Sequence, residues 1–242
     1  MSTVEQVRER QPWFRRLYLP AYQISTAARY VGVHPSTVSA WHTRRDPVLP
    51  GRVQGQALSY LELIEVAFVA FFRKLGVSMS RIREARAYVA QVLGKEYPFA
   101  EYRFKSEGMN VLMEFSQFAS DPSFAKLIAV PDTDPDKIVV ASMHGQLAWE
   151  QLMGSKFAEF DYEFELALRW HPATYESAVV IDPRYSFGAP VVNGLPTWVV
   201  KGRYDAQESI DEIVEEFGIP RESVLDALNF EGVPTAELLE VS

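Results

Sequence analysis

Four carboxylates occupy every second position of one short stretch, FAEFDYEFELALRWH, residues 157–171. They are Glu159, Asp161, Glu163 and Glu165, and His171 follows them. Neighbouring carboxylates can bind a hard cation or share acid and base roles. On a strand, however, successive residues of one face lie about 7 Å apart, which is too far for a compact cation cage. The pattern predicts one strand, or two strands with a turn near Phe164, whose acidic face is solvated; a metal or catalytic site is the alternative.

Other catalytic groups lack the partners that their chemistry needs. The sequence contains no cysteine, which excludes disulfides, thiolate metal sites and cysteine nucleophiles. The four histidines, which are His34, His42, His144 and His171, show neither metal-ligand spacing nor a serine partner. We therefore expect a binding protein without catalytic residues, metal or cofactor.

A different chemistry is indicated by ISTAARYVGVHPSTVSAWH, residues 24–42, which reads as two short helices joined by a Val-Gly-Val corner. Ser25 is the expected cap of the first helix, Gly32 suits the corner, and Pro35 suits the first position of the second helix. We expect Val38 and Trp41 to face inward, and the hydroxyl groups and His42 to face outward. The pattern is typical of a helix-turn-helix that reads DNA, and plain packing of two core helices is the alternative.

The elements that follow point to DNA. Arg44 and Arg45 end the second helix, and residues 50–56 have the polar, basic and turn-rich character of a β-wing. Two more helices are expected, one capped by Ser59 and one from Ser78 to Leu93. This order, with Ser59-Tyr60-Leu61-Glu62-Leu63 and Leu75-Gly76-Val77-Ser78-Met79-Ser80-Arg81-Ile82, resembles the winged-helix DNA-binding domain of the MerR family over about residues 22–93.

This resemblance implies a set of DNA contacts. Side chains in or beside the major groove would be Ser36, Thr37, Ser39, His42 and Arg44; those on the backbone or minor groove would be Arg45, Arg52 and Arg29. The chain has no long coiled coil ending in a cysteine-based effector site, so metal or redox sensing is not expected.

Residues 209–231 repeat the helix-turn-helix pattern with the opposite charge. Ser209 begins one helix, Gly218 ends it, and Pro220 opens the next. From Asp205 to Glu231 there are nine acidic side chains and one arginine, a net charge of 1 − 9 = −8. Phosphates would repel this surface, so we expect it to contact a protein, either a second copy of the chain or a basic partner. The expected contact residues are Asp211, Glu212, Glu215, Glu216, Phe217, Leu228 and Phe230.

A second resemblance covers about residues 178–231. Asp182-Pro183, Gly188, Pro190 and Gly194, followed by the acidic helix pair, resemble a small bacterial and archaeal domain of unknown function that is often the antitoxin partner of a PIN-domain ribonuclease. The whole chain resembles a large VapB-type antitoxin with a MerR-like head. After Gly194 this chain has Leu195-Pro196 where relatives carry Thr-Arg, so the contact of that arginine has no counterpart here.

Charge is divided along the chain. Residues 1–95 carry 14 basic and 6 acidic side chains, net +8, and residues 96–242 carry 10 and 26, net −16. A basic half fits a nucleic-acid partner, and chance clustering of solvated charges is the alternative. The N-terminal residues are too charged for a signal peptide and no segment is long enough to span a membrane, so a cytoplasmic protein is expected.

These observations predict an α+β protein in three parts. They are a winged helix-turn-helix domain (1–95), a small mixed α/β middle region (96–176) with a hairpin at 102–115 and a helix at 142–153, and a C-terminal part (177–242) of β-strands and the acidic helix-turn-helix. We expect a homodimeric antitoxin that neutralises a PIN-domain ribonuclease and represses its own operon by binding operator DNA. The alternatives are a stand-alone MerR-like regulator with a small-molecule effector, and an enzyme that uses the carboxylates of residues 159–165.

Overall fold

The computed structural model describes residues 3–51, 55–101, 104, 154 and 156–235. Its helical head comprises α1 (Thr3–Glu9), η1 (Phe14–Tyr18), α2 (Ile24–Val31), α3 (Pro35–Thr43), α4 (Tyr60–Lys74), α5 (Met79–Leu93) and η2 (Pro98–Ala100). The remainder comprises β1 (Phe160–Glu163), β2 (Leu166–Trp170), β3 (Val179–Ile181), η3 (Ser186–Gly188), β4 (Pro190–Val192), β5 (Leu195–Pro196), α9 (Thr197–Asp205), α10 (Ile210–Phe217) and α11 (Arg221–Phe230). The predicted mixture of helices and strands is confirmed, whereas the expected hairpin at 102–115 and helix at 142–153 lie outside the described residues.

Local signals in the sequence define the ends of the head helices. Gly32 ends α2 in the left-handed conformation, at φ 67°, which lets the chain turn directly into α3. Ser59 caps α4 in a reciprocal capping box with Glu62, and Ser78 caps α5 through the backbone N–H of Arg81. The expected cap at Ser25 is wrong, because α2 begins one residue earlier, at Ile24, and its N-cap residue Gln23 makes no side-chain cap.

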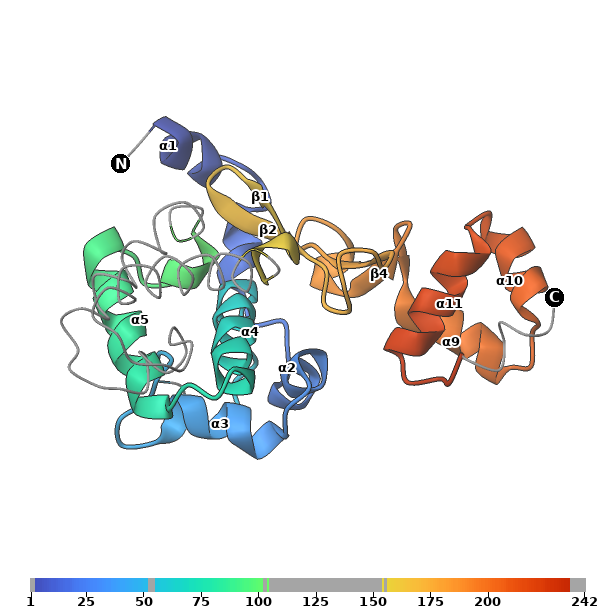
Figure 1. Cartoon of the computed structure of the whole chain (residues 1–242). Coiled ribbons are helices and arrows are strands. Elements are labelled where there is room, and N and C mark those ends of the chain that lie inside the picture. Colours follow the sequence, from blue (N-terminus) through green and yellow to red (C-terminus); the bar gives the residue numbers. More distant parts are fainter. Residues whose placement is uncertain (1–2, 52–54, 102–103, 105–153, 155, 236–242) are drawn as a thin grey trace, which may run out of the picture.

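Helix α4 is the central element of the head. Figure 1 shows it between α2 and α5, and it is buried on almost every side. The fully buried Glu65 binds Arg86 of α5 (Oε2–Nε 2.5 Å) and accepts a hydrogen bond from the backbone N–H of Phe99 (2.8 Å). Burial raises the pKa of Glu65, and Arg86 opposes this shift. A buried charge of this kind fixes α5 and η2 against α4, because leaving it unpaired would be costly.

The predicted β-wing is not confirmed. The described residues between α3 and α4 form no strand and make one isolated antiparallel bridge, between Tyr22 and Leu58. The segment is nevertheless held against α3, because the backbone N–H groups of Val48 and Leu49 both donate to the carbonyl of Trp41 (3.1 Å each).

The strands form one antiparallel sheet in the order β1-β2-β3-β4-β5. The two-strand interpretation of residues 157–171 is confirmed: β1 and β2 are joined by a tight turn at Phe164 and Glu165, both at positive φ. Strands β2 and β3 pair at one residue position, Trp170 opposite Ile181. The sheet crosses position 176/177, where the sequence predicts a domain boundary, so the three-part division stays a prediction.

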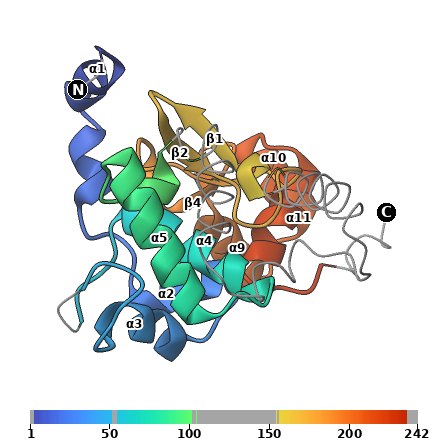
Figure 2. The ribbon, with the colours of Figure 1, turned by 60° about the vertical axis from the view of Figure 1, so that its left-hand side comes forward.

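Two apolar clusters lie on opposite sides of that junction. One joins the head to β1 and β2, and the ring of Phe68 on α4 lies 5.3–5.7 Å from the rings of Phe99, Phe104, Phe157 and Phe160. The other joins β3 and β4 to α9, α10 and α11. Figures 1 and 2 accordingly show the sheet running from the head helices to the C-terminal helices. No described helix is long and apolar enough to cross a membrane.

Candidate DNA-binding and partner-binding surfaces

Helix α3 presents polar groups on the side opposite its buried residues Val38 and Trp41. His34 is its N-cap and accepts a hydrogen bond from Ser36 N–H, and Pro35 occupies the first turn as expected. Ser36 is exposed, and the predicted contacts Thr37 and Ser39 are partly exposed. The surface is short and hydroxyl-rich, with a chemistry that suits phosphates and base edges.

Two arginines extend this surface beyond the end of α3. Arg44 and Arg45 are both exposed, and neither forms an ion pair within the described part of the chain. Their unpaired guanidinium groups are therefore available to an anionic ligand. Arg52, the remaining predicted contact of this segment, lies outside the described residues.

His42 differs from the prediction. Its side chain was expected to point outward, but it is buried, and its Nδ1 donates to the carbonyl of Pro50 (2.9 Å). Direct contact with a base is thus excluded in this conformation. The imidazole instead ties the segment after α3 to the helix.

Arg29 also has a different environment from the expected one. Its Nη1 donates to Glu231 (3.1 Å) and to the carbonyl of Phe230 (3.2 Å), both at the end of α11. Its guanidinium lies over the rings of Tyr30 (5.1 Å) and Phe230 (5.4 Å). The side chain is 47% exposed, so Arg29 joins the head to α11 while it remains accessible to solvent.

The acidic surface is carried by α10. Asp211, Glu212, Glu215 and Glu216 are all exposed, and Phe217 is half-buried at the end of the helix. Glu212 completes the capping box with Ser209, whose N–H and hydroxyl bind its carboxylate and lower its pKa. Asp211 pairs with Arg221 and Glu216 with Arg203.

One predicted contact residue of this surface is corrected. Leu228 is fully buried in the C-terminal cluster, so it supports α11 from inside and cannot touch a partner in this conformation. Phe230 is partly buried and packs against Tyr30, with ring centroids 5.4 Å apart, and its contact with a partner stays a prediction.

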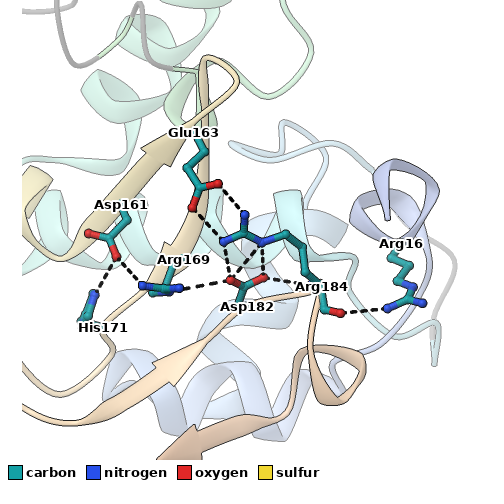
Figure 3. A network of polar contacts seen from close by, with 7 residues as sticks. All are labelled: Arg16, Asp161, Glu163, Arg169, His171, Asp182 and Arg184. Atoms are coloured by element: carbon teal, nitrogen blue, oxygen red, sulfur yellow. Dashed lines mark hydrogen bonds and ion pairs between the residues drawn. The ribbon is translucent and has the colours of Figure 1, made fainter. Parts of the chain in front are cut away.

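The carboxylates of β1 belong to an ion network, drawn in Figure 3. Arg184 binds Asp182 through three hydrogen bonds of 2.7–3.1 Å, and it binds Glu163 with both terminal nitrogens (2.5 and 2.9 Å). Asp161 contacts Arg169 (3.4 Å) and His171 Nε2 (3.3 Å). These carboxylates are ion-paired and also partly exposed, with 34% of the Asp161 side chain and 42% of the Glu163 side chain accessible to solvent. No group of three potential metal ligands converges among the described residues.

This network connects segments that are distant in the sequence. The buried Asp182 needs a cation, and Arg184, two residues later, supplies it. The contacts of Arg184 with Glu163 and of its carbonyl with Arg16 (3.0 Å) were missed. These two pairs are separated by 21 and 168 residues, and no local sequence pattern indicates contacts over such separations.

Lys156 is another residue that sequence reasoning missed. It is buried, its Nζ binds Glu159 (2.5 Å), and it lies 5.3–5.9 Å from the ring centroids of Phe68, Phe71, Phe160 and Trp170. Burial lowers its pKa, and Glu159 opposes that shift. The lysine borders a cavity of about 180 Å³ between α2, α4 and residues 156–173.

The Arg184–Glu163 contact predicts a pH dependence of stability. Hydrogen bonds from Arg184 lower the pKa of Glu163, so this contact stabilises the fold above the ordinary glutamate pKa of about 4.3. The contribution is lost as the pH falls through the lowered pKa. In urea titrations, Glu163→Gln should cost stability near neutral pH, and its difference from wild type should shrink in acid. The exposed carboxylate of Glu9 provides the control Glu9→Gln, and a Glu163→Gln deficit that persists unchanged at low pH would contradict the assignment.

Comparisons with known proteins agree with the architecture. Residues 179–230, which run from β3 to the end of α11, match the family described as "Protein of unknown function (DUF433)". The chain is 25% identical over 238 residues to "Putative antitoxin VapB45" of Mycobacterium tuberculosis, a match that covers 88% of this chain and 95% of that protein. Its fold is similar to the crystal structure of Rv2018 from Mycobacterium tuberculosis, with a TM-score of 0.69 and 21% identity over 88% of this chain and 99% of that one. Both matches cover 88% of this chain.

Proposed function

We propose that this chain is the antitoxin of a type II toxin–antitoxin pair. It acts by binding, without catalysis: α3 and the arginines after it bind operator DNA, and the acidic face of α10 binds a PIN-domain ribonuclease toxin. A homodimer in the cytoplasm would place two heads on a two-fold operator. The similarity to "Putative antitoxin VapB45" along nearly the whole chain supports this proposal most directly.

The charges of the two surfaces support the assignment of partners. Around α3, Arg44 and Arg45 are free to meet phosphates, whereas on α10 the carboxylates would repel them. A ribonuclease needs a cationic path for its RNA substrate, and an acidic helix is complementary to such a path. The two partners are therefore assigned to different ends of the chain.

Salt dependence tests the DNA surface. The affinity of the full-length protein for duplex DNA should fall steeply with ionic strength, and Arg44→Ala should reduce the slope of log K against log salt by about 0.9, the share of one phosphate. Arg10→Ala removes the same charge beside α1, at the far end of the head (Figure 1), and should leave the slope unchanged. Fluorescence anisotropy measures the salt slope of each variant. A binding constant that does not change with salt concentration would refute the assignment of α3 and its arginines to DNA.

Arg29 provides a second test, because α11 holds it within the chain. Glu231→Gln removes its ion pair and leaves the guanidinium free for a phosphate, so DNA binding should strengthen and its salt slope should steepen by about 0.9. Glu222→Gln changes the net charge equally on the exposed side of α11 and is the matched control. Equal effects of the two variants on DNA affinity would show that Arg29 does not reach DNA.

A stand-alone regulator with a small-molecule effector is the second candidate. The cavity beside Lys156 favours it, because this cavity touches both α2 of the helix-turn-helix and the segment after β2. Co-expression with the product of the adjacent gene separates the two functions. An antitoxin should co-purify with a ribonuclease, and Glu215→Lys should weaken the complex more than the matched head variant Glu9→Lys does. A protein that binds no neighbouring gene product but binds a small carboxylate would be the regulator instead.

A further inference from the structure

A second cavity, of about 340 Å³, lies directly beside the proposed DNA-reading helix. Its walls are residues 36–41 of α3, the segment that follows α3, the end of α4 and the first turns of α5. It thus includes residues outside the helix-turn-helix, and neither Arg73 of α4 nor Arg83 of α5 was among the DNA contacts predicted from the sequence.

The charged side chains around this cavity are predominantly basic. Arg44, Arg73 and Arg83 line it from three different elements, and Asp46 is the acidic residue among its lining side chains. Arg73 Nη1 donates to the carbonyl of Val77, which fixes the guanidinium at the end of α4 and leaves its other N–H groups available. Three guanidinium groups that line one cavity repel each other unless an anion lies between them.

Asp46 supplies part of that negative charge. Its carboxylate lies 3.1 Å from Arg83 Nε, but the Asp46 side chain is 75% exposed and that of Arg83 is 27% exposed. Exposed pairs of this kind contribute little to stability, so a better anionic ligand can replace the carboxylate. Only one of the two carboxylate oxygens, Oδ2, is given in this contact with Arg83.

We propose that this cavity is a binding site for a phosphate group. Guanidinium groups from Arg44, Arg73 and Arg83 would share the oxygens of one tetrahedral phosphate, and the hydroxyl groups of Ser36 and Thr37 complete the lining on the α3 side. The phosphate comes either from the backbone of a duplex lying against α3 or from a free phosphate-bearing ligand. Binding of a DNA backbone phosphate rests on the proposed function, whereas binding of a free phosphate-bearing ligand does not.

The position of the site predicts what occupation would do. If a DNA phosphate enters, Arg73 and Arg83 anchor α4 and α5 to the backbone while α3 lies in the groove, and the register of α3 is fixed. If a free phosphate enters, it takes Arg44 away from DNA and acts as a competitor. Asp46 opposes either ligand by its charge, so removing that charge should strengthen phosphate binding.

The test uses the full-length protein and four variants. Arg73→Gln and Arg83→Gln remove lining cations, Asp46→Asn removes the competing anion, and Arg10→Gln, beside α1, is the control for net charge. Duplex binding is measured by anisotropy across a salt series. Binding of inorganic phosphate and pyrophosphate is measured by calorimetry at constant ionic strength, and circular dichroism checks that each variant folds.

A backbone phosphate in the cavity predicts that Arg83→Gln and Arg73→Gln weaken duplex binding by about threefold to tenfold more than Arg10→Gln, each with a shallower dependence of log K on log salt. Asp46→Asn should strengthen duplex binding by more than the removal of one negative charge far from the cavity would. A free-ligand site predicts instead that wild type binds inorganic phosphate or pyrophosphate, that Arg83→Gln loses this binding, and that Asp46→Asn strengthens it, even if duplex DNA does not bind at all. If the lining variants match Arg10→Gln in both assays and Asp46→Asn changes neither, the cavity is not a phosphate site. Asp46→Asn retains the three arginines, so the proposal stays testable if an arginine variant misfolds.

Discussion

The buried carboxylate of Asp182 and the arginine that neutralises it hold the two ends of this molecule in one arrangement. Asp182 is 1% exposed at the end of β3, and Arg184 joins it to Glu163 on β1 and, through its carbonyl, to Arg16 of the head. Other contacts also join the head to the C-terminal part, among them Tyr22 with Gly188 and Arg29 with Glu231, whereas β2 and β3 pair at a single residue position. An unpaired charge at the buried Asp182 would lower the stability of the fold. The contacts of Asp182 and Arg184 therefore constrain where β3–β5 and the C-terminal helices lie relative to the head.

That arrangement places two surfaces of opposite character on different elements. The α3 surface is basic and rich in hydroxyl groups, and the α10 surface is acidic. Between them, Arg29 reaches from α2 to the end of α11, where Glu231 also accepts a hydrogen bond from Thr197 (2.5 Å). Arg29 thereby connects a head residue to the end of α11 through an ion pair in which the arginine side chain is 47% exposed and that of Glu231 is 12% exposed.

The sequence predicted best those features that depend on neighbouring residues. The starts of α4 and α10 at Ser59 and Ser209, and the ends at Gly32 and Gly218, follow from capping chemistry within one helical turn. Side-chain direction was harder, since the environments of His42 and Leu228 are set by packing against segments remote from their own pattern. Helix α9 was missed, because its Trp-Val-Val start resembles a strand and it has no side-chain cap. Arg29 and Glu231 are 202 residues apart, so no local sequence pattern predicts that they pair.

The most direct test of the account is hydrogen–deuterium exchange of the full-length protein with and without duplex DNA. If the chain meets its partners at opposite ends, DNA should slow exchange in α3 and in the residues that follow it, and should leave α10 unchanged. Protection of α10 by DNA, or no protection of α3 at a DNA concentration that saturates binding, would contradict the division of the chain into a nucleic-acid surface and a protein surface.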